Sequence, residues 1–361
     1  MSAHVVVDAR MIHDGGIGTY LRNVVPRVAR ARPQWRWTAL GDHGELERAR
    51  WTSIAGMTAV HCDTPVLGAR EQLELPPRIP ADANVLWAPH YNVPMLALRP
   101  RLVVTIHDVA HVARPDVFGL GPAAYARVLL WYVRARASRV IFDTEFSRAE
   151  MGRLIGDVGA RGAVAHLAAD DAWSASRAVA APMDGPYFIY LGNLKLHKNV
   201  PLLLRAFRRV CDRIPHRLVL MGRRERVRVD PLVAREIAAL GDRVVDVGET
   251  TPDVAYGYVA NATALVTASL YEGFGLPPLE AMAAGCPCVV SRAGSLPEVC
   301  GDAALYCDPT DESDVAAAML RVATDRALRD DLIARGRARA HAFSWDRCAD
   351  ITAGAIDLAL A

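Results

Sequence analysis

Among its charged residues, this 361-residue chain is poorest in lysine. Lysine and arginine together number 42, and only Lys195 and Lys198 are lysines. Both lie in the stretch GNLKLHKNVP (192–201), directly after an apolar run. Chemistry that depends on a lysine amine, such as a Schiff base with pyridoxal phosphate, is therefore confined to one short segment.

A surplus of either charge is also missing. The 40 acidic residues nearly balance the basic ones, the formal net charge is +2, and no block of like charge stands out. A nucleic-acid partner is therefore not expected. Hydrophobic residues make up 52% of the chain and charged residues 23%, which is typical of a globular protein. The length suffices for two domains, each with its own core.

Paired cysteines and long apolar runs are absent as well. The seven cysteines are scattered with no C-x-x-C pair, which indicates reduced thiols in the cytoplasm. No apolar run reaches the roughly 18–20 residues of a membrane span. The start, MSAHVVVDAR, lacks the pattern of a signal peptide. We expect a cytoplasmic protein without a transmembrane segment, and peripheral contact with the inner membrane face stays open.

Short apolar runs alternate with amphipathic helical stretches along the whole chain. This rhythm predicts an α/β protein with parallel sheets covered on both faces. The chain divides into an N-terminal domain over 1–172, a linker over 173–185, a C-terminal domain over 186–343 and a final helical segment over 344–361. The predicted strands are 4–8, 84–88, 102–106, 139–143, 187–191, 217–221, 243–247, 264–268 and 287–291.

Ligands of such sheets bind at the carboxyl ends of the strands, so the loops there are the candidate sites. After the first strand, Gly15, Gly16 and Gly18 predict a loop before a helix that opens near Thr19. The glycine that a dinucleotide fingerprint requires is replaced by Leu21, which argues against nicotinamide binding. A tight turn and an anion site both remain open for this loop.

Two further loops follow strands directly. His107 comes after the run at 102–106 and is placed toward the ligand edge of its sheet. Lys195 and Lys198 occupy the loop before a helix that starts near Asn199. They are either solvated surface lysines or compact charges that contact a phosphate.

The segment YEGFGLPPLEAMAAG (271–285) is the most informative. It predicts a loop with Glu272, then a helix that carries Glu280 and ends at Gly285. The two carboxylates, eight positions apart, can face one cleft, and the amides of residues 274–276 would lie at a helix N-terminus that favours anions.

Glu298 has a structural explanation in the sequence that Glu272 lacks. The stretch SLPE (295–298) predicts a capping box with Ser295 as the N-cap.

Taken together, these motifs resemble the retaining glycosyltransferases of family 4, which have the two-domain fold called GT-B. The resemblance rests on YEGFGLPPLEAMAAGCPCV with its E-x7-E pair, SLPEVCGDAALYCDP, YLGNLKLHKN, TIHD, the first glycine loop and the terminal FSWDRCA, and so spans almost the whole chain. It implies two Rossmann-like domains that face a cleft. It also implies a nucleotide-sugar donor bound mainly by the C-terminal domain and an acceptor bound by the N-terminal domain. The final helix would return to the N-terminal domain.

The resemblance further assigns roles to residues. Glu280 would hold the nucleotide ribose, Glu272 the hydroxyls of the transferred sugar, and Lys198 the diphosphate. His107 would lie near the sugar. The remaining donor contacts that it implies are Gly16, Asn193, Gly273, Phe274, Gly275 and Leu276.

One departure concerns the phosphate loop, where Asn193 stands in place of a common arginine. Lys195 or His197 could supply the missing charge. The chain has no D-x-D motif for a metal, so no metal or other cofactor is expected. The family's usual mechanism is front-face attack, in which the leaving phosphate accepts the proton of the acceptor.

The resemblance is greatest to bacterial mannosyltransferases that use GDP-mannose, which makes that donor the favoured one. A UDP-sugar donor, a sugar phosphorylase and an inactive nucleotide-sugar-binding protein are the alternatives. The acceptor, which would be a glycan, a lipid-linked molecule or a small molecule, is not encoded by any motif. The stretch LLWYVRARASR (129–139) is either a packed helix with a basic face or a contact for a lipid-linked acceptor.

Overall fold

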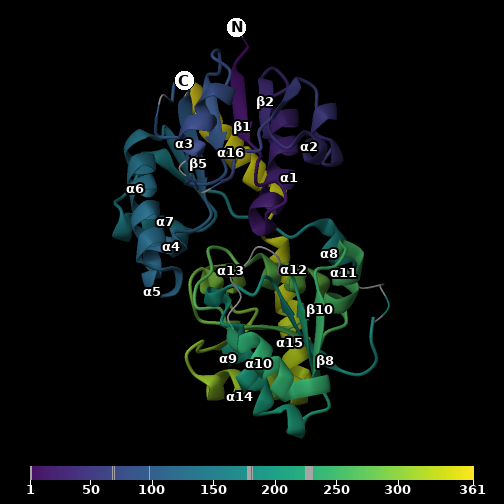
Figure 1. Ribbon diagram of the computed structural model, residues 1–361. Helices are drawn as coiled ribbons and strands as arrows, with labels where there is room; N and C mark the ends of the chain where they lie inside the picture. Colours follow the sequence, from purple (N-terminus) through teal and green to yellow (C-terminus); the bar gives the residue numbers. More distant parts are fainter. Residues whose placement is uncertain are drawn as a thin grey trace. The chain divides into compact units, whose positions relative to one another are not determined.

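The computed structural model describes residues 2–66, 68, 70–96, 98–176, 180, 182–223 and 231–361. The chain forms two compact units (Figure 1). The first comprises the residues up to Leu167 together with Ser344–Ala361, and the second comprises Ala168–Phe343. Of the linker predicted over 173–185, residues 177–179 and 181 lie outside the described residues.

The first unit contains a seven-stranded sheet with the order β3-β2-β1-β4-β5-β6-β7, and all of its pairings are parallel. Every residue of β1 is buried, as expected for a central strand covered on both faces. The strands are β1 (His4–Asp8), β2 (Arg36–Gly41), β3 (Met57–His61), β4 (Val85–Ala88), β5 (Arg101–Ile106), β6 (Arg139–Phe142) and β7 (Gly162–Val164).

The second unit contains a six-stranded parallel sheet with the order β10-β9-β8-β11-β12-β13. The chain order reverses beside β8, and α/β sheets bind ligands at such a switch point. The strands are β8 (Tyr187–Leu191), β9 (Arg217–Met221), β10 (Val244–Gly248), β11 (Ala264–Thr267), β12 (Cys288–Ser291) and β13 (Leu305–Cys307).

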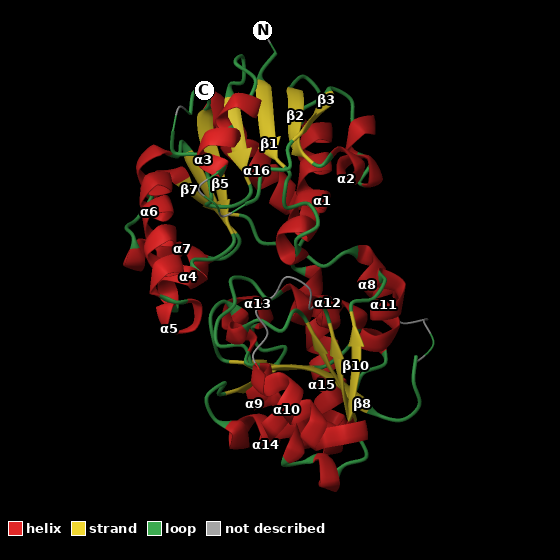
Figure 2. Cartoon of the chain, viewed as in Figure 1, coloured by secondary structure: helices red, strands yellow, loops and turns green. Residues whose placement is uncertain are grey.

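Helices cover both sheets, as Figure 2 shows. Those of the first unit are α1 (Gly15–Ala31), α2 (His43–Arg48), α3 (Glu71–Glu74), α4 (Ala110–Ala113), α5 (Pro115–Phe118), α6 (Leu120–Arg136), α7 (Glu145–Leu154) and α16 (Trp345–Leu360). Those of the second are α8 (Asp171–Ala175), α9 (Val200–Arg208), α10 (Pro231–Leu240), α11 (Pro252–Ala260), α12 (Leu276–Ala284), α13 (Leu296–Cys300), α14 (Glu312–Thr324) and α15 (Arg326–His341). No helix among the described residues has both the length and the apolar content that crossing a bilayer requires.

Helix α1 begins earlier than the sequence predicts. The helix opens at Gly15 and not near Thr19, so the predicted glycine loop forms its first turn. The amide of Gly18 already donates to the carbonyl of Asp14 over 3.0 Å. A Cβ on Gly18 would lie 2.5 Å from the carbonyl oxygen of Ile12, so glycine lets this turn pack directly on the chain before it.

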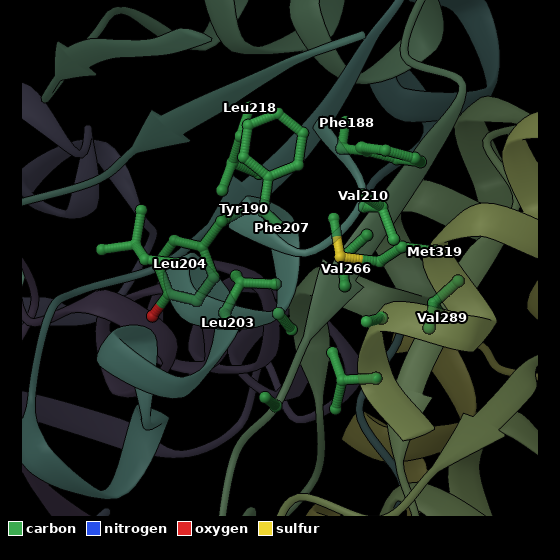
Figure 3. Close-up of a cluster of buried hydrophobic side chains, with 14 of the residues drawn as sticks. Phe188, Tyr190, Leu203, Leu204, Phe207, Val210, Leu218, Val266, Val289 and Met319 are labelled. Carbon is green, nitrogen blue, oxygen red and sulfur yellow. The ribbon is translucent and has the colours of Figure 1, made fainter. Parts of the chain in front are cut away.

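Buried side chains fill the space on both faces of each sheet. In the second unit, Phe188 and Tyr190 of β8 meet Leu203 and Phe207 of α9 in one cluster (Figure 3). This packing fixes α9, and with it the loop between β8 and α9 that contains Lys198.

The C-terminal helix α16 belongs to the first unit. Ser344 is its N-cap, and its side chain accepts a hydrogen bond from the amide of Arg347. The helix packs against α1 and against strands β4, β5 and β6. The final segment is thus part of the core of the N-terminal sheet.

Two residues of α16 test this packing. Ile356 is fully buried, whereas Leu358 is 58% exposed. Ile356→Ala should lower the free energy of unfolding by about 2–5 kcal/mol, because it leaves a cavity. Leu358→Ala should change it by less than about 0.5 kcal/mol. Urea unfolding of the two variants checks this, and equal small losses would contradict the packing described.

Candidate active site

In the second unit, an ion pair joins the loop between β8 and α9 to the loop after β11. The Lys198 amine donates to both carboxylate oxygens of Glu272, over 2.7 and 2.8 Å. The two side chains are only 15% and 14% exposed. An ammonium group has three N–H donors, so one remains for another acceptor.

Local backbone structure brings these two loops together. After β8, the chain makes a 3-10 turn at Leu196–Lys198, and Asn199 then takes a left-handed conformation with φ 54° before α9 begins. The amide of Leu270 donates to the carbonyl of His197 over 2.7 Å. Lys198 and Glu272 therefore meet because the main chains of their two loops are hydrogen-bonded to each other close by, at His197 and Leu270.

The Glu272 loop is also held from its other side. The Ser295 amide and hydroxyl both donate to the Glu272 carbonyl, and the hydroxyl is also 2.9 Å from the carbonyl of Phe274. A Cβ on Gly294 would lie 2.5 Å from the Glu272 carbonyl oxygen, so only glycine permits this approach. Backbone contacts thus fix the position of Glu272.

The capping box predicted at Ser295 is wrong. Ser295 precedes α13, but its side chain makes no cap hydrogen bond there. It is fully buried, and its hydroxyl bonds to the Glu272 loop instead. The S-x-x-E spacing is thus present, but the neighbouring loop offers buried carbonyls that need a donor.

The charge on Glu272 is stabilised despite its burial. Burial by itself would raise the pKa of this carboxyl. The charges of Lys198 and His197 and hydrogen bonds from Lys198 and Ser269 outweigh burial and lower the pKa. Glu272 is therefore an ionised acceptor at neutral pH.

Helix α12 starts at Leu276, directly after the loop that carries Glu272. Gly275 has φ 101°, and a Cβ there would lie 2.6 Å from the side chain of Leu296. Pro277 and Pro278 lack an N–H, so the amides of residues 274–276 are the donors that this helix start can offer to an anion.

Glu280, on the same helix, has partners different from those of Glu272. The indole of Trp173 donates a hydrogen bond to it, and the charge of Asp170 lies nearby. Burial, followed by the charge of Asp170, raises the pKa of Glu280 to about 7. The structure thus gives the two carboxylates of the predicted pair different surroundings and opposite pKa shifts.

Asn193 and Lys195 lie in the β8–α9 loop, and their hydrogen bonds join residues of this loop to each other and to β8. The Asn193 carbonyl accepts from the Tyr190 hydroxyl over 2.5 Å, and the Asn193 side-chain oxygen accepts from the Lys195 amide over 3.3 Å. Asn193 thus shapes the loop.

The first unit holds a second polar group, at the carboxyl end of β5. His107 Nδ1 donates to Asp143 Oδ2 over 2.6 Å. Asp143 is buried, and the His107 side chain is 13% exposed. No described group hydrogen-bonds to His107 Nε2 with good geometry, although the backbone of Pro89 is close enough to favour the protonated ring. Burial lowers the pKa of His107, but the charge of Asp143 outweighs it, so that the pKa is raised overall.

The sequence-predicted residues therefore fall into three groups. The first is the Lys198–Glu272 loop pair, with Gly273 and residues 274–276 beside it. The second is Glu280 with its separate neighbours. The third group lies in the first unit and consists of His107 and of Gly16 in the first turn of α1.

Sequence reasoning missed the residues that position these groups. Asp143 follows β6 as His107 follows β5, and these strands are neighbours in the sheet. Reading both strand ends together would have found it. No signal pointed to Ser295, because its spacing from Glu298 already had an explanation.

Comparison with known proteins identifies related chains. Residues 171–339 match the family model described as glycosyl transferases group 1. The O-antigen chain mannosyltransferase B of Escherichia coli is 33% identical over 272 residues, which are 72% of this chain and 70% of that protein. The MMP alpha-(1->4)-mannosyltransferase of Mycolicibacterium hassiacum is 43% identical over 108 residues, 28% of this chain and 26% of that protein.

Solved structures show the same fold. The structure of Anabaena Alr3699/HepE in complex with UDP and glucose has a TM-score of 0.77 at 16% identity, covering 98% of this chain and 99% of that one. The predicted GT-B fold with two Rossmann-like domains is confirmed by this likeness and by the two parallel sheets.

The raised pKa of Glu280 predicts a pH dependence of stability. The folded-state pKa of about 7 lies above the ordinary value of 4.5. Stability from this group is therefore complete below about pH 4.5 and is lost as the pH rises to about 7, by up to about 3 kcal/mol. Glu280→Gln removes the titration, so wild type should lose stability relative to this variant between pH 4.5 and 8.

Thermal unfolding of both proteins at several pH values measures this difference. Glu249→Gln, which changes an exposed carboxylate paired with Arg223, is the control. A constant difference between wild type and Glu280→Gln would contradict the shift.

Proposed function

This chain belongs to the group 1 glycosyl transferases, and from this premise we propose that it is a retaining transferase that moves mannose from GDP-mannose to an acceptor hydroxyl. The observation that supports this most is the buried Lys198–Glu272 pair at the carboxyl edge of the second sheet. It combines a sugar-binding acceptor with a cation for a diphosphate. The mannosyltransferase relatives favour mannose as the sugar.

In this proposal, the second unit binds the donor. The carboxylate of Glu272 accepts hydrogen bonds from sugar hydroxyls, while the third N–H of Lys198 points to the diphosphate. The amides of residues 274–276 add donors to the same anion, with Gly273 and Asn193 shaping the loops beside it. These groups stabilise charge on the leaving group as it develops.

Glu280 is proposed to bind the nucleotide ribose. Two ribose hydroxyls would donate to its carboxylate and favour the ionised form, which its surroundings otherwise disfavour. Nucleotide binding should therefore release a proton from Glu280 near neutral pH.

The first unit contributes two proposed contacts. His107 would use Nε2 toward a sugar hydroxyl, because Asp143 occupies its Nδ1. Gly16 would use the amides of the first turn of α1 toward the diphosphate, since helix N-termini favour anions.

The reaction is proposed to proceed on one face of the sugar. The bond between the anomeric carbon and the phosphate oxygen breaks, and the acceptor oxygen bonds to that carbon on the same face. The acceptor's proton passes to the leaving phosphate. Among the described residues, no three His, Cys, Asp or Glu side chains gather as a metal site, and the proposal assigns the diphosphate charge to Lys198 and backbone amides.

A UDP-sugar is the second candidate donor, because the fold resembles that of a protein solved with UDP and glucose. Thermal shift distinguishes the two, since a ligand that binds the native state raises its melting temperature. We expect a larger shift with GDP than with UDP, and the same GDP shift in Glu272→Gln, which should have lost sugar transfer from GDP-mannose. A Glu272→Gln variant that no longer binds GDP would overturn the division of roles, and no shift with either nucleotide would overturn the donor assignment.

Turnover is expected to depend far more on Lys198 than on Arg223, a cation in another loop. Lys198→Ala should lower turnover by about 100-fold or more, the scale for loss of one stabilising donor. Arg223→Ala should lower it less than about threefold, because Arg223 lies in an exposed pair with Glu249. Initial rates with GDP-mannose and an acceptor extract measure both.

Lys198→Ala could lose activity by unfolding, because it leaves the carboxylate of Glu272 without its cation. A second variant controls for this effect. Lys198→Arg keeps the charge and should stay folded at the wild-type melting temperature, with turnover reduced about tenfold or more. Small, equal effects of Lys198→Ala and Arg223→Ala would contradict the phosphate role.

A further inference from the structure

Helix α6 of the first unit exposes large apolar side chains to solvent. Leu120 is 80% exposed, Val128 54% and Trp131 59%. All six other tryptophans of the chain are 6% exposed or less. Trp131 is therefore the only tryptophan at the surface, and it lies on the same helix as two other exposed apolar residues.

These side chains form one stripe along the helix. At about 100° per residue, Leu120, Ala124, Val128, Trp131 and Ala135 fall within an arc of about 80°. We call these five residues the α6 face. The helix has 17 residues, so the α6 face extends for roughly 20–25 Å.

The opposite side of α6 accounts for the stability of the helix. Ala126, Leu129, Leu130 and Val133 are buried and pack in the core of the first sheet. The helix therefore has two apolar sides, and only one is covered by the described residues of the chain. Figure 2 shows α6 beside α4 and α5, which it contacts.

The charges that α6 itself carries are positive. The helix sequence LGPAAYARVLLWYVRAR contains no acidic residue and three arginines, Arg127, Arg134 and Arg136. Asp157 is the carboxylate near Arg134. Amides of Gly159 and Val158, together with the charges of Arg148 and Arg134, lower its pKa, so two arginines share this one negative charge.

We propose that the α6 face docks the protein on an anionic membrane surface. Tryptophan prefers the boundary between headgroups and acyl chains, where its ring is apolar and its N–H stays hydrated. Arginines beside an apolar stripe add attraction to anionic lipid headgroups. A second copy of the chain is a poorer occupant, because a symmetric contact through this face would bring the arginines of both copies together.

The test uses the full chain and lipid vesicles. Co-sedimentation with vesicles of phosphatidylglycerol and phosphatidylcholine should bring down wild type at least tenfold more strongly than vesicles of phosphatidylcholine alone. Trp131→Ala/Val128→Ala should weaken binding to the mixed vesicles at least tenfold. Arg127→Gln/Arg136→Gln should weaken it by about fivefold per arginine.

Fluorescence locates the contact. Because the other tryptophans are buried, a blue shift of emission on mixed vesicles, and quenching by brominated lipid, should come from Trp131. Both signals should disappear in Trp131→Phe. Leu358→Ala, which removes an exposed leucine from α16, should leave binding unchanged.

Each contrary outcome overturns the proposal. These are wild type that stays in the supernatant with mixed vesicles, or a double variant at Trp131 and Val128 that sediments like wild type. A third is self-association in lipid-free sedimentation equilibrium that Trp131→Ala abolishes, which would assign the face to a second copy. Far-ultraviolet circular dichroism of each variant confirms that it remains folded.

Discussion

The Lys198–Glu272 ion pair is the interaction on which the second unit's site depends. Removing either charge of a largely buried ion pair is destabilising, because the remaining charge is left without compensation. The surrounding backbone reflects this requirement. Ser295 and Gly294 hold the Glu272 carbonyl, and the amide of Leu270 joins that loop to the turn that ends at Lys198. The pair is thus fixed before any ligand binds, which limits the reorganisation that binding would cost.

The loop before α12 and the helix itself each carry a carboxylate, and the two have opposite properties. Glu272 faces a cation and hydrogen-bond donors, which lower its pKa, whereas Glu280 faces burial and the charge of Asp170, which raise its pKa to about 7. Eight positions of sequence therefore separate a carboxylate that is ionised at neutral pH from one whose pKa lies near neutrality. A ligand that donates two hydroxyls would stabilise the charge on Glu280, so its ionisation is linked to what binds there.

Most of the sheet architecture could be predicted from the sequence, because central parallel strands are continuous apolar runs. The strands β8 and β9 match their predicted bounds, Tyr187–Leu191 and Arg217–Met221. The edge strands β3, β7 and β13 and the inner strand β2 were not predicted, since they are short or mixed with polar residues. The predicted glycine loop is the first turn of α1, because helix propensity says little where a glycine permits close packing.

The candidate site was predictable by residue type but not by pairing. Lys198 and Glu272 were each expected to contact a ligand, yet 74 positions separate them, and no pattern shows that they bind each other. Asp143 beside His107 was missed for the same reason. Ser295 was misassigned because a local rule fitted its spacing, while a tertiary contact with the Glu272 loop used its hydroxyl instead. Local rules predict elements well, and contacts between loops depend on the sheet order that brings strand ends together.

The use of lysine at position 198, in a chain that otherwise uses arginine almost throughout, has a physical explanation. An arginine opposite Glu272 would present a planar fork that a carboxylate fills with two parallel hydrogen bonds. Lysine spreads its three donors around a tetrahedral nitrogen, so two can hold the carboxylate oxygens at 2.7 and 2.8 Å while the third points elsewhere. The proposed role of Lys198, in which one cation binds a carboxylate of the chain and an anion of the ligand together, therefore favours lysine over arginine. Lys195 has no such constraint in the structure, and it is the lysine whose replacement by arginine should be tolerated.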